Sequence, residues 1–404
     1  MVKEQQSSWQ SGVAKNITFI VTKDCQLACK YCYLVGKNTK ERMNFEVAKQ
    51  AIDYILSSDY KEESVVWDFI GGEPFLEIEL IDEICDYIKL ELFRRNHHWF
   101  NSYRFSFSTN GINYHTEKVQ AFIKKNLSHL SIGITIDGTE VKHDLNRVYK
   151  GDDERGSYKD VVRNIPLWLE QFPNAGTKVT ISSADIPYIK ESVLHLFRLG
   201  IKEVNINCVF EDVWEDKDDE KFEEQLILLA DEIIEGEYYK NCACSFYSEH
   251  IGKPMNVKFE NQNWCGAGRM LAIDAVGNFY PCTRFAQYSL RNKKARIIGN
   301  VNDGINNNLL RPFLTLDRCT QSPLKCIECN VASGCAWCQG ENYDAADTST
   351  IYQRATAICK MHKARVRANN YYWNKLYRKL EMEGVAKNET SQRVKDIFSA
   401  KINC

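Results

Sequence analysis

The chain has 404 residues, of which 44% are hydrophobic, and a formal net charge of −2. This length supports a sizeable core and more than one domain, and the small charge gives no global electrostatic basis for nucleic-acid binding. No stretch approaches the roughly 20 apolar residues of a membrane helix, and the polar N-terminus lacks the apolar core of a signal peptide. We therefore expect a cytoplasmic protein that binds neither nucleic acid nor a membrane.

From residue 17 to residue 210, short β-branched or aromatic runs alternate with helical patterns. The expected strands are Ile17–Val21, Val65–Phe69, Tyr103–Phe107, Leu130–Ile136, Lys178–Ile181 and Glu203–Val209. The expected helices are Phe45–Leu56, Glu79–Phe93, Glu117–Lys125, Tyr158–Glu170 and Ile189–Leu199. Such alternation predicts parallel strands with right-handed crossovers. Six strands are too few for an eight-stranded barrel, so a partial barrel or a doubly wound sheet fits, with functional residues at the carboxyl ends of the strands.

The remaining segments differ in composition. We expect an extension at 1–16, the α/β region at 17–210, an acidic helical connector at 211–263, a cysteine-rich region at 264–359 and a basic tail at 360–404. Few long periodic segments occur between 264 and 359, which suggests internal metal staples. The tail has eleven Lys and Arg against four Asp and Glu and is expected to begin as a packing helix over 364–383.

Cysteines are the unusual feature, because the chain has sixteen of them. In a secreted protein they would indicate disulfides, but without an export signal clustered thiolates indicate metal or cluster ligands. Five fall between Cys319 and Cys338, whereas Cys85 and Cys208 stand alone and receive no role here.

The first cysteine group, Cys25, Cys29 and Cys32, follows the first expected strand directly. Cubane iron–sulfur clusters are normally held by four thiolates. Three local ligands leave one iron with an open position, which separates a catalytic metal site from a structural one. The alternative is a zinc site or a closed cluster with a distant fourth cysteine.

This CxxxCxxC motif, with Tyr31 before its third cysteine, resembles the signature of the radical S-adenosylmethionine (radical SAM) superfamily. Gly71-Gly72-Glu73-Pro74 after the second strand resembles the family's GGEP motif. Segments 108–111, 135–138 and 143–147 resemble further family segments, and Arg147 either pairs with the cofactor carboxylate or forms a surface salt bridge. The resemblance implies these cofactor-binding residues: Tyr31, Gly71, Gly72, Glu73, Pro74, Ser108, Asn110, Thr135, Asp137 and Arg147.

The resemblance implies one-electron chemistry, in which a reduced cluster cleaves S-adenosylmethionine to a 5′-deoxyadenosyl radical. The chemistry belongs to the cofactors, while the protein orients and shields it. No catalytic residue is assigned beyond the cluster ligands.

The C-terminal cysteines form a second array. Within it, four residues separate Gly277 from Cys282. From the residues alone, seven cysteines at close spacing can ligate up to two iron–sulfur clusters or form a pair of zinc ribbons. The pattern resembles the SPASM domain, which binds two auxiliary [4Fe–4S] clusters, although its CxxxC element is shortened here to Cys335-x-x-Cys338. The expected fold is therefore α/β, a partial (β/α)6 radical SAM barrel followed by a small SPASM domain and a C-terminal helix.

The resemblance also implies the auxiliary ligand sets. The second auxiliary cluster would use Cys326, Cys329, Cys335 and Cys359. The first would use Cys265, Cys282 and Cys338, and Phe259 stands where relatives have a further cysteine. Its fourth position falls to Cys319, Cys242 or Cys244, or stays open for a substrate thiolate.

SPASM enzymes mostly act on peptides or proteins. Thr283 replaces the Asp that sulfatase maturases typically place after the cysteine matching Cys282, which argues against formylglycine formation. Residues 264–269 and 284–285, with 298–300 downstream, are similar to maturases of ribosomally made, cysteine-rich peptides that form thioether bonds. The alternatives are another SPASM-type modification, namely carbon–carbon crosslinking, epimerisation or formylglycine formation, or a non-enzymatic iron–sulfur or zinc scaffold.

The expected partners follow from this hypothesis. They are a cysteine-containing precursor peptide and a reductant such as a flavodoxin or ferredoxin. Many such maturases carry an N-terminal leader-binding domain, whereas here the first strand begins by residue 17. Leader recognition would then need the tail, the acidic connector or a separate protein.

Overall fold

We describe a computed structural model of the chain, which covers residues 14–151, 154–254 and 265–384. The strands are β1 Lys15–Thr22, β2 Val65–Gly71, β3 Tyr103–Thr109, β4 Leu130–Ile134, β5 Thr177–Ile181, β6 Glu203–Cys208, β7 Ala243–Cys244, β8 Leu271–Ile273, β9 Asn278–Tyr280, β10 Gly299–Asn300 and β11 Gly304–Ile305. The helices are α1 Phe45–Leu56, α2 Ile78–Arg94, α3 Glu117–Asn126, α4 Glu140–Asn146, α5 Tyr158–Val162, α6 Ile165–Gln171, α7 Ile189–Arg198, α8 Asp218–Glu235, α9 Asn307–Thr315, α10 Arg318–Gln321, α11 Leu324–Ile327, α12 Gln339–Asp344 and α13 Cys359–Met382.

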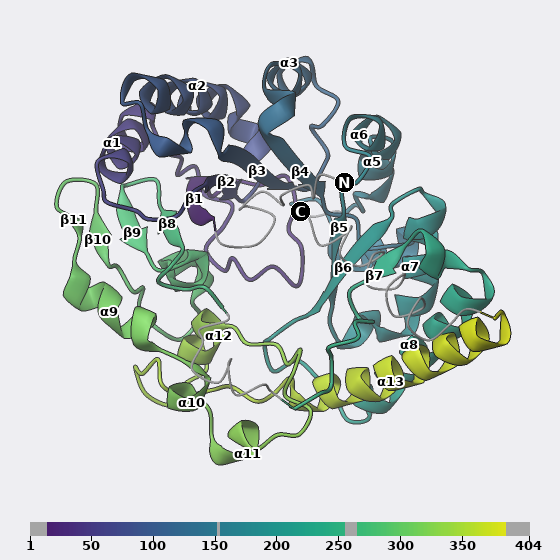
Figure 1. The fold of residues 1–404 in the computed structure, drawn as a ribbon. Coiled ribbons are helices and arrows are strands. Elements are labelled where there is room, and N and C mark those ends of the chain that lie inside the picture. The colour runs from purple at the N-terminus through teal and green to yellow at the C-terminus, as the bar shows by residue number, and fades with distance from the viewer. Residues whose placement is uncertain (1–13, 152–153, 255–264, 385–404) are drawn as a thin grey trace.

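The six expected parallel strands form a curved wall, and the expected partial barrel is confirmed (Figure 1). Strands β1 to β4 pair in parallel in chain order, and β5 pairs with β6 in a second sheet. Between β4 and β5 a side chain bridges the backbones, because the Thr177 hydroxyl donates to the Ile134 carbonyl (2.8 Å) and accepts from the Ile136 N–H (3.1 Å). The wall therefore continues across a break in the strand ladder.

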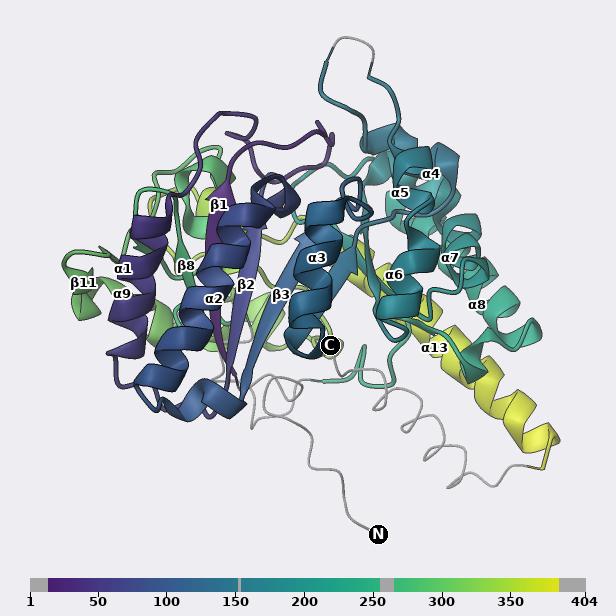
Figure 2. The same cartoon turned by 90° about the horizontal axis from the view of Figure 1, so that it is seen from above.

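The two faces of β1, β2 and β3 differ in chemistry. Phe19, Phe69 and Phe107 are buried and stack in a row, with ring centroids 5.7 and 5.2 Å apart. Phe107 also meets Phe122 of α3 at 5.6 Å, so this face packs against the outer helices seen in Figure 2. Each such aromatic pair contributes about 0.5–1.5 kcal/mol beyond area burial.

The alternate positions on the same strands are polar. Asp68 accepts hydrogen bonds from the hydroxyls of Thr18 and Ser106, and burial raises the pKa of its carboxyl. Strand side chains alternate between faces, so the surface opposite the aromatic row is hydrophilic. Parallel sheets are normally apolar on both faces, and a polar inner face indicates a wall that borders a ligand cavity.

Most expected helices match the structure within a few residues, and α1 matches at both ends. The expected helix Tyr158–Glu170 is wrong in one respect, because it is broken at Arg163 and Asn164 into α5 and α6. Pro166 lacks the N–H that would continue the first helix. The Asn164 side chain instead donates to the Gly111 carbonyl at 2.8 Å, which fixes the break against the loop after β3.

The cysteine-rich region joins the barrel edge through its first strand. β8 pairs in parallel with β1 and antiparallel with β9, and β9 to β11 continue the same sheet. The sheet therefore runs across the expected boundary at residue 264, and the expected domain limits remain predictions. Parts of the expected N-terminal extension, connector and tail, including Phe259, lie outside the described residues.

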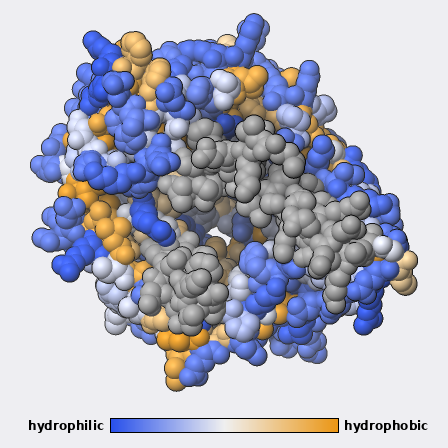
Figure 3. All heavy atoms as spheres, viewed as in Figure 1, coloured by the Kyte–Doolittle hydropathy of each residue, from blue (hydrophilic) through white to orange (hydrophobic). Residues whose placement is uncertain are grey.

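Most of the coloured residues in Figure 3 are hydrophilic, and small patches of hydrophobic residues lie among them. Across the described ranges, no helix is both long enough and apolar enough to span a bilayer. α13 instead packs along α8, and Arg367 of α13 contacts Glu223 of α8 at 2.5 Å.

Candidate active site

A cavity of about 470 Å³ lies at the carboxyl ends of the barrel strands and is called the cofactor cavity here. Its wall includes the first cysteine group, Cys25, Cys29 and Cys32, from the loop after β1. The loop is held against the end of α4 and the segment after it, because the Ala28 N–H donates to the Val148 carbonyl at 2.8 Å and the Lys30 N–H donates to the Asn146 carbonyl at 3.0 Å. Burial raises the pKa of the Cys25 thiol to about 11, and it also raises the pKa of the Cys29 thiol.

Gly71 and Gly72 allow the end of β2 to lie directly against the cysteine loop. A Cβ at Gly71 would stand 2.3 Å from the Thr22 carbonyl oxygen, and one at Gly72 would stand 2.1 Å from that of Asp24. The N–H groups of Gly72 and Glu73 donate to these two oxygens, each at 2.8 Å. The glycines are therefore required by the close approach of two backbones, whichever ligand the cavity holds.

Glu73 ties three strand ends together. Its buried carboxylate accepts hydrogen bonds from the N–H groups of Phe75 (3.0 Å) and Asn110 (2.7 Å) and from the Thr109 hydroxyl (2.6 Å). Burial raises the pKa of Glu73, while these hydrogen bonds oppose the rise. The Asn110 amide continues the link, donating to Gln26 at 3.0 Å and lying 3.8 Å from the Cys25 sulfur.

Tyr31 stands between an acid and a base. Its hydroxyl donates to Asp137 Oδ2 and accepts from Arg147 Nη1 at 3.0 Å. Burial disfavours ionised Asp137, but Lys142 and then Arg147 outweigh it and hold its pKa below the usual value. Because Tyr31 lies between two members of the first cysteine group, this contact anchors the loop to the ends of β4 and α4.

The structure brings most of the sequence-predicted residues to one wall. Of the predicted cofactor-binding residues, those that line the cofactor cavity are Tyr31, Gly72, Glu73, Ser108, Asn110, Thr135 and Arg147. Gly71, Pro74 and Asp137 lie behind that lining, where they pack or orient the residues in front. A direct cofactor contact by those three remains a prediction.

Three C-terminal cysteines gather beside the cofactor cavity, and one of them, Cys338, lines it. Cys265 and Cys338 share a hydrogen bond and both interact with Cys282. This hydrogen bond lowers the pKa of Cys338, and Arg284 adds to the effect. Cys338 and Arg284 themselves line the cofactor cavity, so it touches both cysteine groups.

The other four predicted auxiliary ligands line a second cavity of about 240 Å³. They are Cys326, Cys329, Cys335 and Cys359. Arg354 donates to the Cys335 sulfur at 3.3 Å and to the Ala336 carbonyl at 3.4 Å, which places a cation beside the thiols. Thus the structure collects the cysteines in the two sets that the sequence pattern predicts.

Three weaker candidates occupy other places. Cys319 lies on α10, Cys244 lies on β7 and Cys242 precedes it, and none of them lines either cavity. Within the described part of the chain, no three His, Cys, Asp or Glu side chains converge on a single metal ion. Thiolates of a cubane bind different irons and therefore stand farther apart than the ligands of one zinc ion.

Several cavity residues escaped the sequence analysis. Cys208 and Lys178 line the cofactor cavity from β6 and β5, and Arg284 lines it from the segment after Cys282. Arg284 Nη2 donates to Glu211 (3.1 Å) and Glu341 (2.7 Å). The position of Cys208 at the end of a parallel strand was the one available signal.

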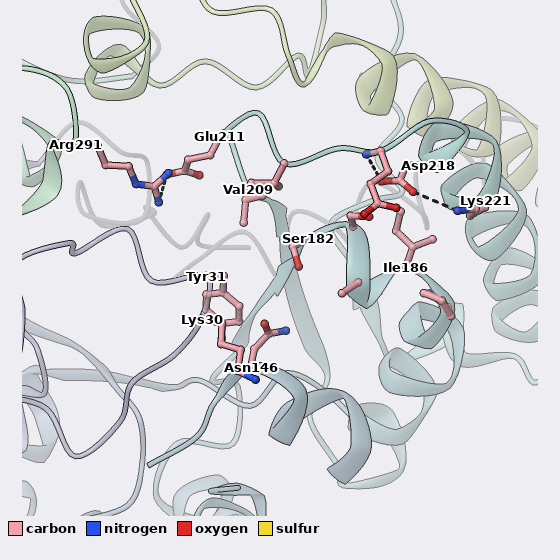
Figure 4. Close-up of a pocket in the computed structure, with 15 residues that line it drawn as sticks. Lys30, Tyr31, Asn146, Ser182, Ile186, Val209, Glu211, Asp218, Lys221 and Arg291 are labelled. Carbon is pink, nitrogen blue, oxygen red and sulfur yellow. Dashed lines mark hydrogen bonds and ion pairs between the residues drawn. The ribbon is translucent and has the colours of Figure 1, made fainter. Parts of the chain in front are cut away.

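A side pocket of about 470 Å³ adjoins the cofactor cavity and shares Tyr31, Val209 and Glu211 with it. Figure 4 shows Glu211 joined to Arg291 at one end and Asp218 joined to Lys221 at the other. The charged groups at both ends are thus already paired. The rest of the lining mixes polar side chains such as Ser182 and Asn146 with apolar ones such as Ile186.

Comparisons with known proteins agree with this geometry. The model of the Radical SAM superfamily matches residues 19–199. The chain carries a radical SAM domain. It is 29% identical over 299 residues to the uncharacterized protein MJ0907 of Methanocaldococcus jannaschii, a match that covers 72% of this chain and 89% of that protein.

Solved structures share the fold over most of the chain. The structure of anSMEcpe with bound AdoMet and Kp18Cys peptide has a TM-score of 0.65 at 18% identity, covering 91% of this chain and 99% of that one. Streptococcus suis SuiB bound to its precursor peptide SuiA has a TM-score of 0.59 at 15% identity, covering 85% and 75%.

The radical SAM domain over residues 19–199 supports an enzyme that uses S-adenosylmethionine and an iron–sulfur cluster. The residues present fit these groups. Three thiols face one cavity with a polar wall. Arg147 Nε is buried there and, among the residues that the structure describes, has no hydrogen-bond partner.

Proposed function

We propose that this enzyme matures a ribosomally synthesised precursor peptide by forming cysteine thioether crosslinks. One observation carries the proposal: the cofactor cavity is lined by the first cysteine group and also by Cys338 and Arg284. A peptide held in this cavity would meet the radical source on one side and the C-terminal cysteines on the other. Peptide-bound anSMEcpe and SuiB, which share the fold, support a peptide as the substrate.

Three [4Fe–4S] clusters are part of the proposal. Cys25, Cys29 and Cys32 would hold the one that binds S-adenosylmethionine, and the two C-terminal sets would hold auxiliary clusters. When bound, the first cluster and S-adenosylmethionine supply a 5′-deoxyadenosyl radical that takes a hydrogen atom from the substrate. Arg147 and Asn110 would orient the cofactor, and the surrounding wall excludes water from the radical.

Crosslinking removes two hydrogen atoms from the peptide. One leaves as the abstracted atom, and the other leaves the thiol as a proton and an electron. A flavodoxin or ferredoxin would supply the electron for cofactor cleavage and accept the electron released. The side pocket offers the neighbouring peptide residues a place beside the reacting one, and its mixed polar and apolar lining favours small uncharged side chains. The connector, the tail or a separate protein would recognise a leader.

Cys208 favours epimerisation as a second candidate. A thiol on the cavity wall can return a hydrogen atom to a carbon radical, and the resulting sulfur radical then takes an electron from the reductant and a proton from solvent. Thr283 continues to argue against formylglycine formation.

The experiment is a mass-spectrometric assay of the reconstituted enzyme with S-adenosylmethionine, reductant and a display library of cysteine-containing peptides. Crosslinking predicts products that have lost two hydrogens and whose cysteine resists alkylation. In deuterated water, epimerisation predicts products in which one carbon-bound hydrogen is replaced by one deuterium, and Cys208→Ala would abolish them. Deoxyadenosine release without any modified peptide would contradict both.

A further inference from the structure

A fully buried lysine lies behind the cofactor cavity and touches two acids. Lys142 has 0% exposure, and its ammonium group is 3.8 Å from Asp137 Oδ2 and 3.4 Å from Asp185 Oδ1. It also donates to the Thr180 carbonyl at 2.6 Å. Burying an ammonium group is costly unless charges and hydrogen bonds compensate for it, and here both are present.

Arg147, on the cavity side, has a different environment. It is only 6% exposed, and its hydrogen bond to Tyr31 reaches a neutral hydroxyl. Within the described ranges no carboxylate approaches it closely enough for an ion pair, and its Nε has no hydrogen-bond partner. A buried guanidinium in this state is poised to accept an anionic ligand.

Tyr31 and Asp137 connect the two cations. Tyr31 donates its proton to Asp137 and therefore presents only its lone pairs to Arg147. Asp137 also accepts the Thr180 N–H at 3.3 Å, and Asp185 accepts the Asn146 amide at 2.8 Å. Asp137 is therefore engaged by Tyr31, Lys142 and Thr180, and Asp185 is engaged by Lys142 and Asn146.

We propose that Lys142 is a positioning residue that reserves Arg147 for the carboxylate of S-adenosylmethionine. Lys142 neutralises Asp137, so that the acid holds the Tyr31 hydroxyl without drawing the Arg147 guanidinium away from the cavity. Without Lys142, the charge of Asp137 would lose its nearby cation, and Asp137 would compete with the cofactor carboxylate for Arg147. This inference rests on the proposed cofactor site and names the side chains that prepare it.

The experiment compares S-adenosylmethionine with decarboxylated S-adenosylmethionine, which lacks only the carboxylate. Affinities are measured by calorimetry on the anaerobically reconstituted enzyme without reductant, so that no turnover occurs. In Tyr31→Phe the preference for S-adenosylmethionine should fall about tenfold, as expected for a weakened hydrogen bond to a charged group. The affinity for the decarboxylated compound should fall much less than the affinity for S-adenosylmethionine, whereas general structural damage would lower both affinities equally.

Tyr87→Phe is the matched control. The Tyr87 hydroxyl donates to Asp53 at 2.9 Å, and Asp53 pairs with Arg95, so the same Tyr–Asp–Arg chemistry occurs on α1 and α2 outside the cavity. This variant should keep the full preference for the carboxylate.

Lys142 itself is tested by a rescue. Lys142→Met should lose the preference, and Lys142→Met/Asp137→Asn should recover most of it, because the competing acid is removed together with its cation. If the single variant does not fold, the affinities of Tyr31→Phe and the double variant test the role of Lys142.

If wild type binds neither compound, both the proposed cofactor site and this inference are wrong. If wild type prefers S-adenosylmethionine but Tyr31→Phe keeps that preference, or the double variant loses it, only the inference fails.

Discussion

The two cysteine regions of this enzyme are built in different ways. The first group lies on one loop after the eight-residue strand β1, and protein groups such as Glu73 and Tyr31 fix the surroundings of that loop. The C-terminal cysteines lie among strands of two or three residues and helices as short as four. The barrel thus shapes its site through its own core, whereas we expect the C-terminal region to depend on the proposed auxiliary clusters for its order.

Removing the first cysteine group should give the largest functional effect and little structural change. In Cys25→Ala/Cys29→Ala/Cys32→Ala, release of 5′-deoxyadenosine should fall to the uncatalysed background. The thermal midpoint should move by only about 3 °C, the shift that roughly 1 kcal/mol produces in a domain of this size. Chromatography and calorimetry measure both, and a globally unfolded variant would contradict the comparison.

Removing C-terminal cysteines should instead change the structure of the C-terminal region and leave cofactor binding by the barrel intact. Cys335→Ala/Cys359→Ala should lose about four irons, one cubane's content, and residues 265–384 should become sensitive to protease. The barrel should stay resistant and should still bind S-adenosylmethionine. Limited proteolysis with peptide mapping checks this, and Cys85→Ala, which changes a buried cysteine outside both cavities, is the control. Equal sensitivity of the two regions would contradict the difference between them.

Gly72→Ala tests the close backbone approach at the first site. The new Cβ would meet the Asp24 carbonyl oxygen at 2.1 Å and push the cysteine loop away. We expect destabilisation of about 3 kcal/mol, typical of overpacking, and weaker binding of S-adenosylmethionine. Gly133→Ala on β4 is the matched control, because its Cβ would stand 3.7 Å from the nearest atom. If Gly72→Ala behaves like this control, the glycines are not needed for packing.

The smallest effect concerns His143, whose buried ring contacts the Asp137 N–H and the Ser157 hydroxyl. Burial, and then Arg147, lowers its pKa to about 3. Below its usual pKa of about 6.5 the unfolded chain binds a proton that the folded chain does not, so stability is complete above that pH and falls as the pH drops towards 3. Between pH 6.5 and 5 the loss should be about 2 kcal/mol. Denaturant titrations should show that the free energy of unfolding falls with decreasing pH more steeply for wild type than for His143→Gln between pH 6.5 and 5. Equal pH dependence of the two proteins would contradict a neutral buried ring.

Sequence periodicity predicted the barrel well and its finer features poorly. Phe45–Leu56 and the six strands could be predicted because local patterns encode them, and the GGEP and cysteine motifs located the cavity wall. Arg284 and Cys208 could not be placed, because their neighbours come from distant segments. The burial of Lys142 was also unpredictable, since lysines are almost never fully buried unless paired.

The most direct test of the account is anaerobic reconstitution of the wild-type enzyme with iron and sulfide. Iron is counted, and 5′-deoxyadenosine is measured after addition of S-adenosylmethionine and reductant. The account predicts about twelve irons per chain, the content of three cubanes, together with reductant-dependent release of deoxyadenosine. Bound zinc with no deoxyadenosine would contradict it.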